Sequence, residues 1–500
     1  MSLPDLIEIV PLEQPVHAEI TVPGSKSITN RALILAALAE GETVLQGALW
    51  SEDTQIMVEC LQELGFMVNV EPDPNEPCNR TITVYGKGGS VPPGGTAEQP
   101  LELFVGNAGT AARFLSAFVC LGSGVYRLHG VPRMHERPQA ALFAALRELG
   151  FQVESEKGND KLPVRIVGQS SSRGNEAHSE KISQSLLTSA TTNERGHSCT
   201  VSIEQSSQFA SALLLGAKAG GWDVKITGEN ADESPYVAMT SELIKAFPHQ
   251  GGTFQIEPDA SSGSYFEAAN FFAEGPESLQ HSDQFGILIP TKPLNAVKVK
   301  HWPDTSWQAD EKFPEVLLMT PSLYFGLAYR GKNLAIDPQT FESLNEFCKK
   351  RGTKNAISRN SDLGDSIMTA ITIAPFALDA VCFTDLGRLR VQECERVVAL
   401  RTELTKCGAK VVEEGDTLTV YPSQLHGAEI ETYNDHRMAM SFAILGLKVP
   451  GIRIQNPACV KKTFPNFFQK LAAPPPHGLG ATILDAATGR KLKVEELFAE

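Results

Sequence analysis

The chain has 500 residues, and its 42% apolar content is enough for two or more sizeable hydrophobic cores. Its formal net charge of −15 argues against nucleic acid and anionic membrane surfaces as partners. The most apolar run, residues 367–383, is interrupted by Pro375 and Asp379 and is too short to span a bilayer.

Nine cysteines are scattered along the chain, and none forms a Cys-x2-Cys pair. This pattern predicts reduced thiols in a cytoplasmic protein rather than a disulfide framework or a zinc site. Residues 1–15 contain no lysine or arginine, so they predict neither a signal peptide nor a transit peptide.

The first strong element is a turn, Pro23-Gly24-Ser25-Lys26-Ser27, that leads into an Ala- and Leu-rich helix ending near Gly41. The first amides of a helix have no internal partner, and the helix dipole is positive there. Lys26 and Arg31 add two cations on neighbouring turns, so the segment predicts an anion site. The spacing of a Walker phosphate loop is absent, and a capped surface helix with two solvated cations is the alternative.

This pattern recurs five more times. Each copy is a short polar segment followed by a helix that is apolar nearly all round, and such a helix is expected to be buried. The polar segments start at Asn107, Ser206, Ser261, Asp362 and Asn434, and the last two helices are expected over 366–378 and 438–447. The spacing of roughly 80 residues indicates an internal repeat. The alternative is six unrelated core helices with ordinary caps.

A second element also repeats, a helix that ends at glycine and is followed by strand residues, at 61–68 and 146–153 and more loosely at 404–411. One unit therefore reads strand, buried helix, strand, surface helix, strands. Six units predict an α/β protein with three units in each of two domains. If the six buried helices point the same way, their positive ends converge on one anion site.

The segment from Pro23 to Leu33 resembles the signature of the 5-enolpyruvylshikimate-3-phosphate synthase family. Further motifs follow in family order at Asn107–Arg113, Pro132–Pro138, Arg390–Arg396, Tyr433–Met440 and Lys461–Pro465, so that the resemblance covers residues 15–470. It implies a two-domain inside-out α/β barrel of the enolpyruvyl transferase type, with three repeated units per domain.

In this family the chain starts in the second domain, builds the first and returns. The resemblance therefore implies a second domain from residues 1–20 and 258–500 and a first domain from residues 21–257. Residues 169–197 and 314–356 are interpreted as loops or insertions. Residues 471–500 are expected to form a peripheral C-terminal appendage, because the tail from Pro474 opens with three prolines.

The resemblance implies transfer of the enolpyruvyl group of phosphoenolpyruvate to the 5-hydroxyl of shikimate 3-phosphate, with release of phosphate, in the shikimate pathway. Both substrates are small anions that require several fixed cations. No metal or organic cofactor is expected. We expect a monomer without nucleic-acid or membrane partners.

The family motifs assign roles to individual residues. Shikimate 3-phosphate is expected to contact Lys26, Ser27, Arg31, Ser206, Ser207, Gln208, Tyr236, Asp365 and Gln392. Phosphoenolpyruvate is expected to contact Lys26, Asn107, Gly109, Thr110, Arg137, Gln208, Glu393, Arg396, His436, Arg437 and Lys462. Asp365 would be the base toward the 5-hydroxyl, Glu393 the acid toward the methylene carbon, and Lys26 the third residue assigned to catalysis.

Three positions depart from the family pattern on the acceptor side. Gln392 stands where lysine is usual. Arg388, four residues earlier, stands where the family often has asparagine and is a candidate to restore the charge. Glu233 stands where a serine normally contacts the acceptor phosphate, and Ser234 is a candidate to replace it. These changes leave open an enolpyruvyl transferase with another acceptor, such as a UDP-sugar, or a ligand-binding relative without activity.

Overall fold

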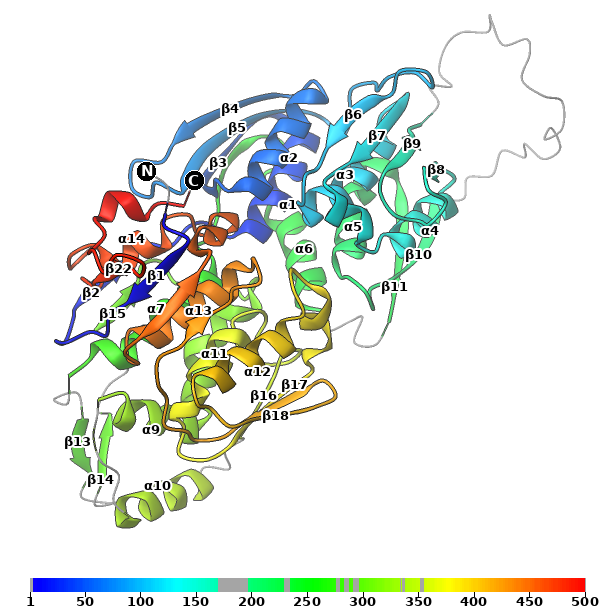
Figure 1. Ribbon diagram of the computed structural model, residues 1–500. Coiled ribbons are helices and arrows are strands. Elements are labelled where there is room, and N and C mark those ends of the chain that lie inside the picture. Colours follow the sequence, from blue (N-terminus) through cyan, green and yellow to red (C-terminus); the bar gives the residue numbers. More distant parts are fainter. Residues whose placement is uncertain are drawn as a thin grey trace, which may run out of the picture.

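The computed structural model describes residues 3–169, 197–228, 234–275, 279–282, 287–290, 296–332, 334, 338–350 and 355–499 (Figure 1). The predicted insertion at 169–197 lies almost entirely outside the described residues, as does Glu233.

The recurring unit expected from the sequence is present in two complete copies within these ranges. The first consists of β6 (Leu101–Phe104), α3 (Gly109–Phe118), β7 (Val125–His129), α4 (Ala140–Glu148), β8 (Gln152–Ser155) and β9 (Val164–Val167). The second consists of β16 (Ala356–Ser358), α11 (Ile367–Ile373), β17 (Val381–Thr384), α12 (Arg396–Lys406), β18 (Val411–Glu414) and β19 (Thr417–Val420). In both sheets the first two strands are parallel and the other pairs are antiparallel.

Two more sheets repeat this pairing with strands that are far apart in the chain. One has the order β12 (Gly252–Gln255), β3 (Glu40–Leu49), β5 (Asn79–Lys87), β4 (Met67–Pro72). The other has the order β20 (Glu429–Ile430), β21 (Ile452–Gln455), β1 (Leu6–Ile9), β22 (Ile483–Asp485). The described strands also form parallel pairs of β10 (His197–Ser202) with β11 (Trp222–Thr227) and β15 (Val297–Val299) with β2 (Ala18–Ile20), and a β13 (Leu279–Ser282)–β14 (Ile287–Pro290) hairpin.

The six expected buried helices are all present. They are α1 (Lys26–Leu38), α3, α5 (Gln208–Gly220), α7 (Ala260–Ala273), α11 and α13 (His436–Gly446). The expectation that the fifth continues to residue 378 is wrong, because α11 ends at Ile373 and a 3-10 turn, Ala374–Phe376, follows. Pro375 has no amide hydrogen to donate, so it ends the α-helical pattern.

The buried apolar side chains form two large clusters. The first core draws on residues 28 to 256. The second core combines residues between 3 and 22 with residues between 265 and 499. The chain crosses between them at two places that lie side by side: Ser25 N donates to Glu257 O at 2.8 Å and Asp259 N donates to Pro23 O at 2.9 Å. We propose that these cores are the two domains, and their exact bounds stay a prediction.

The C-terminal tail is not the peripheral appendage that its prolines suggested. Strand β22 adds to the edge of β1, where Ile7 pairs with Asp485, and Figure 1 shows the dark-blue β1 among the orange and red elements. Leu479, Ile483 and Leu497 are part of the second core. The tail is built into the fold because it covers apolar surface that β1 would otherwise expose.

The described residues between 314 and 356 are largely helical, which corrects the interpretation of this stretch as a loop. They contain most of α8 (Phe313–Leu318), then α9 (Pro321–Arg330) and α10 (Pro338–Lys350). Leu323 and Leu327 of α9 pack into the second core, whereas Phe325 and Tyr329 belong to a small separate core. Helix α9 has apolar residues on two faces, and each face packs against a different core.

The other helices that matter for the site are α2 (Glu52–Glu63), α6 (Pro235–Ala246) and α14 (Phe467–Ala472). The eight cysteines whose side chains the structure describes are free. In the part of the chain that the structure describes, no helix combines the length and apolar character that crossing a membrane requires.

We predict that the tail stabilises the second core. Ile483 is fully buried, so Ile483→Ala leaves a cavity and should cost about 2–5 kcal/mol, which lowers the thermal unfolding midpoint by several degrees. Lys491→Ala, at an exposed position of the same tail, is the control. An equal shift in the two variants would contradict a core role for the tail.

Candidate functional site

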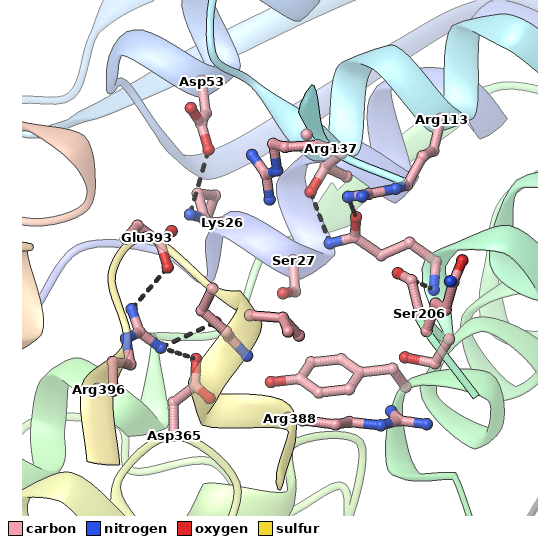
Figure 2. Close-up of a pocket in the computed structure, with 18 of the residues that line it drawn as sticks. Lys26, Ser27, Asp53, Arg113, Arg137, Ser206, Asp365, Arg388, Glu393 and Arg396 are labelled. Carbon is pink, nitrogen blue, oxygen red and sulfur yellow. Dashed lines mark hydrogen bonds and ion pairs between the residues drawn. The ribbon is translucent and has the colours of Figure 1, made fainter. Parts of the chain in front are cut away.

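The N-terminal ends of five of the six buried helices face one pocket. Its lining includes first-turn or preceding residues of α1, α3, α5, α11 and α13. It is lined by Lys26, Ser27, Asp53, Gly109, Thr110, Arg113, Arg137, Pro138, Gln205, Ser206, Ser207, Gln208, Tyr236, Arg359, Asp365, Arg388, Val391, Gln392, Glu393, Arg396, His436, Arg437 and Lys462 (Figure 2). This described lining carries eight lysine or arginine side chains against three carboxylates, so the pocket is strongly cationic.

On the first-core side, the cations are held mainly by neutral partners. Arg137 donates to the carbonyl of Asn107 at 3.2 Å, and Arg113 donates to Gln208 Oε1 at 2.7 Å. Gln208 in turn donates to Thr110 Oγ1 at 3.0 Å, so the orientation of its amide is fixed. These two guanidinium groups therefore keep most of their charge available to a bound anion.

Lys26 is the exception on this side, because its ammonium lies 3.2 Å from Asp53 Oδ2. In Figure 2 this pair lies on the same side of the pocket as Arg137 and opposite Arg396. Asp53 belongs to the first turn of α2, where a carboxylate is favoured by the helix dipole.

Gly109 lies where the backbone must approach two arginines closely. A Cβ added at Gly109 would lie 2.7 Å from both terminal nitrogens of Arg137 and 2.8 Å from Arg113 Nη1. Such contacts are shorter than packed atoms tolerate, so any side chain here would displace the guanidinium groups. The contact of Gly109 with phosphoenolpyruvate stays a prediction.

On the second-core side, Asp365 is surrounded by three arginines. Its Oδ1 accepts from Arg359 Nη2 at 2.9 Å, and its Oδ2 lies 3.1 Å from Arg437 Nε and 3.6 Å from Arg396 Nη1. Burial alone would raise the pKa of Asp365, but Arg437, Arg396 and Arg359 outweigh burial and hold this pKa below its ordinary value. The carboxyl is therefore ionised at neutral pH.

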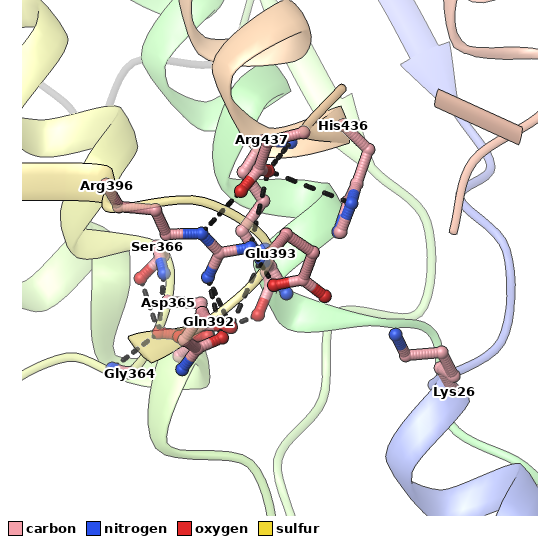
Figure 3. Close-up of polar contacts among 12 residues, drawn as sticks. Lys26, Gly364, Asp365, Ser366, Gln392, Glu393, Arg396, His436 and Arg437 are labelled. Carbon is pink, nitrogen blue, oxygen red and sulfur yellow. Dashed lines mark hydrogen bonds and ion pairs between the residues drawn. The ribbon is translucent and has the colours of Figure 1, made fainter. Parts of the chain in front are cut away.

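Arg396 is fully buried and links three acidic or polar partners. It donates to Asp435 Oδ2 at 2.7 Å, to Glu393 Oε2 at 2.7 Å and to Gln392 Oε1 at 2.8 Å (Figure 3). Gln392 thus stabilises a cation instead of supplying one. Arg396 comes from α12, a helix outside the repeated set of six, so the repeat alone did not indicate it.

Glu393 is held by cations on both sides of its carboxylate. Besides Arg396, Lys462 lies 3.0 Å from its Oε1. Burial would raise the pKa of Glu393, but Arg396, Lys462 and Lys26 outweigh burial and hold this pKa well below its ordinary value. Loss of these partners to a ligand would let the pKa of Glu393 rise, because desolvation would then dominate.

A strained turn presents the residues at the start of α13. Tyr433 and Asn434 have φ values of 53° and 54°, a left-handed conformation that costs residues with side chains about 1–3 kcal/mol. The Tyr433 hydroxyl donates to Glu403 at 2.8 Å. The turn places Asp435 at the N-cap of α13, where it accepts from Arg437 N at 2.8 Å as well as from Arg396.

His436 enters the pocket as a neutral ring. Burial, reinforced by Arg437, holds the pKa of His436 well below 6.5. Within the described part of the chain neither ring nitrogen makes a hydrogen bond. One nitrogen can therefore donate to a ligand and the other can accept.

Of the residues predicted for the site, all line the pocket except Arg31 and Asn107. Arg31 is buried beneath it and donates to Thr240 and Ser211, at 2.7 and 3.0 Å, and so ties α1 to α6 and α5. Asn107 contributes its carbonyl to Arg137.

Three charged lining residues were missed by the sequence reasoning. They are Asp53, Arg113 and Arg359. Arg113 ends a motif that had already been singled out, so its place at the start of an apolar helix was an available signal. Asp53 and Arg359 carried no comparable signal, because each is brought to the pocket by tertiary contacts with Lys26 and Asp365.

The pocket can bind small multivalent anions and holds two carboxylates that can exchange protons with them. Among the described residues there is no group of three or more His, Cys, Asp or Glu side chains that could hold a metal ion.

Comparison with known proteins extends the resemblance. A family model described as EPSP synthase (3-phosphoshikimate 1-carboxyvinyltransferase) matches residues 11–194 and 296–471. The chain is 35% identical over 487 residues to 3-phosphoshikimate 1-carboxyvinyltransferase of Trichormus variabilis, covering 93% of this chain and 98% of the relative. Its identity to the enzyme of the same name from Nostoc sp. is 36%, with the same coverage.

Solved structures agree on the fold. EPSP synthase from Acinetobacter baumannii superposes with a TM-score of 0.62 at 19% identity, over 96% of this chain and 99% of that one. The enolpyruvyl transferase NikO from Streptomyces tendae gives 0.57 at 14% identity, over 98% and 99%. These likenesses confirm the two-domain α/β fold expected from the sequence. With the family model and the curated relatives, they show that this chain belongs to the EPSP synthase family.

Proposed function

We propose that this chain transfers the enolpyruvyl group of phosphoenolpyruvate to the 5-hydroxyl of shikimate 3-phosphate and releases phosphate. The observation that carries the proposal is the pocket itself, in which eight cationic side chains surround two ionised carboxylates, Asp365 and Glu393. The curated relatives named 3-phosphoshikimate 1-carboxyvinyltransferase support the same reaction. We propose that the protein acts as a monomer. The free cysteines fit a reducing compartment, and we propose that the enzyme works in the cytoplasm.

The donor lies between the two cores. Arg137 and Lys26 on the first-core side and Arg396, Arg437 and Lys462 on the second-core side hold its phosphate and carboxylate. Guanidinium groups bind such oxygens in pairs, and in a buried pocket these bonds are stronger than in water. The two cores are drawn together because anions from both substrates offset the repulsion among the cations.

The acceptor lies toward α5 and α6. Its phosphate is held by Ser206, Ser207 and Arg388, and its ring lies beside Tyr236. Arg388 replaces the lysine that is missing at Gln392, because its guanidinium reaches across to the first-core side and donates to Ile203 O at 2.9 Å (Figure 2). No carboxylate forms an ion pair with Arg388 in the described ranges, so its charge is open to the phosphate.

The chemistry consists of an addition and an elimination. Asp365 takes the proton of the 5-hydroxyl while the oxygen of that hydroxyl forms a bond to C2 of the donor. Glu393 protonates the methylene carbon of the donor. Glu393 then removes a proton from the resulting methyl group as the C2–O bond to phosphate breaks. Glu393 becomes an acid only after the donor has engaged Arg396 and Lys462, because its pKa rises when it loses these partners.

The direct test mixes purified protein with phosphoenolpyruvate and shikimate 3-phosphate and follows phosphate release and the enolpyruvyl product. We expect release with this acceptor and none with unphosphorylated shikimate at the same concentration or with a UDP-sugar. Release only with another acceptor would establish the alternative transferase. No release from folded protein at any concentration would establish the binding relative.

The pocket as the site of this reaction is tested by removing one cation. Lys26→Met should lower kcat/KM by about 10²- to 10³-fold, because a charge that stabilises the developing negative charge is lost. Lys245→Met is the matched control, since Lys245 is exposed and pairs with Glu242 outside the pocket. Equal activity of the two variants would contradict this placement of the site.

Arg388→Ala should raise the KM for shikimate 3-phosphate by roughly 10- to 100-fold, the value of one or two charged hydrogen bonds. The KM for phosphoenolpyruvate should change much less. Arg401→Ala, which removes an arginine that pairs with Glu413 outside the lining, should change neither constant. An unchanged acceptor KM in Arg388→Ala would show that another group binds the acceptor phosphate.

Proton uptake tests the proposed change at Glu393. Shikimate 3-phosphate and inorganic phosphate together fill the pocket without turnover, and calorimetry in two buffers of different ionisation enthalpy counts the protons taken up. On binding these ligands, the wild type should take up as much as about one proton more than Glu393→Gln. The reason is that the bound anions raise the pKa of Glu393 from its depressed value. The difference should grow as pH falls from 7 to 5. No difference at any pH would mean that Glu393 keeps its cations in the complex.

A further inference from the structure

The N-terminus of α7 differs from those of the other five buried helices, because within the described residues it lines no part of the cationic pocket. Its first turn is closed by groups of the protein. Asp259 caps it by accepting from Ser262 N at 2.7 Å, and the hydroxyl of Ser261 donates to Asp310. The position where a ligand anion would lie is thus taken by an internal carboxylate.

Asp310 is only 4% exposed and accepts four hydrogen bonds. Besides Ser261 Oγ, its donors are Gly364 N at 2.7 Å, Ser366 N at 3.2 Å and Ser366 Oγ at 2.5 Å. No lysine or arginine forms an ion pair with it among the described residues. A buried carboxylate is costly unless such donors satisfy it, so the arrangement has little freedom to relax.

The donors on the α11 side flank a single residue, Asp365. Figure 3 shows Gly364, Asp365 and Ser366 together, with the Asp365 side chain beneath Arg396. A Cβ at Gly364 would lie 3.1 Å from both oxygens of Asp310, so the backbone and this carboxylate are in tight contact. Asp310 therefore holds the peptide on both sides of Asp365 while its own side chain stays outside the pocket lining.

We propose that Asp310 is a positioning residue that fixes the turn Gly364–Ser366, so that the Asp365 carboxylate stays aimed at the acceptor hydroxyl. This inference rests on the proposed function, in which Asp365 is the base. A displacement of about 1 Å at a reacting group can cost 10²-fold in rate, and two backbone amides tied to one carboxylate prevent such a displacement. Helix α7, the one buried helix of the six whose N-terminus does not line the pocket, thus acts on the site indirectly, through Ser261 and Asp310.

The test compares Asp310→Ala, Asp310→Asn and Gly364→Ala with Ile483→Ala. The control weakens the same core without removing a contact to the turn at Asp365, because Ile483 is buried in the tail outside the pocket lining. Asp310→Ala should lower kcat about 100-fold with substrate KM values changed less than about 3-fold. Asp310→Asn keeps an acceptor oxygen and should restore most of kcat, whereas Gly364→Ala should lower kcat and Ile483→Ala should not.

A double-mutant cycle tests whether Asp310 acts through Asp365. In an Asp365→Asn background, Asp310→Ala should add almost nothing to the loss of kcat, because both changes remove the same function. Equal losses of kcat on adding Asp310→Ala in the wild-type and Asp365→Asn backgrounds would overturn the proposal. A loss of kcat in Asp310→Ala no larger than that in Ile483→Ala would overturn it as well.

Hydrogen exchange gives a readout that does not depend on turnover. The amides of Gly364 and Ser366 should exchange faster in Asp310→Ala than in the wild type, while the amides of α13 keep their protection. Unchanged protection at both amides would overturn the positioning role and leave the proposed function intact. Absence of phosphate release from the wild type would overturn the proposed function, and the exchange measurement would still decide whether Asp310 holds the turn.

Discussion

Eight cationic side chains share one pocket in a chain whose net charge is −15, and this concentration of like charge is the constraint that the rest of the site satisfies. Arginines at such short separations repel one another and lose hydration when buried. The protein supplies its own anions: Asp53 pairs with Lys26, Glu393 with Lys462, and Asp435 and Asp365 with arginines. Among the described residues no carboxylate forms an ion pair with Arg113, and burial together with Arg137 lowers the pKa of Arg113 to about 9.

The fold makes this concentration of charge possible. Repeated units place helix N-termini at the interface of two cores, where free amides and helix dipoles favour anions. The second core contributes most of the internal carboxylates, whereas Arg113 and Arg137 on the first-core side are held by neutral oxygens. An anionic ligand therefore meets exposed positive charge on one side and must compete with carboxylates on the other.

This asymmetry connects binding to chemistry. In the proposed reaction, Asp365 and Glu393 neutralise the charge of the arginines before the substrates bind. After the substrate anions have taken their place beside the arginines, the two carboxylates carry protons. A carboxylate that loses cationic partners inside a dry pocket becomes more basic, so the binding step itself prepares the proton transfers. The turn held by Asp310 keeps one of these carboxylates in place while its electrostatic surroundings change.

The sequence by itself determined the α/β class, the recurring unit and the six buried helices, because helix periodicity and cap chemistry are local properties. Most of the pocket lining followed from the resemblance of its motifs to those of the family. Only the tertiary structure decided that α7 turns its N-terminus away from the pocket, that Arg31 lies beneath the pocket, and that Asp53 and Arg359 enter it. It also decided that the C-terminal tail completes a sheet and that the described residues between 314 and 350 are largely helical. Most of these features depend on contacts between segments that are far apart in the chain, which no local pattern encodes.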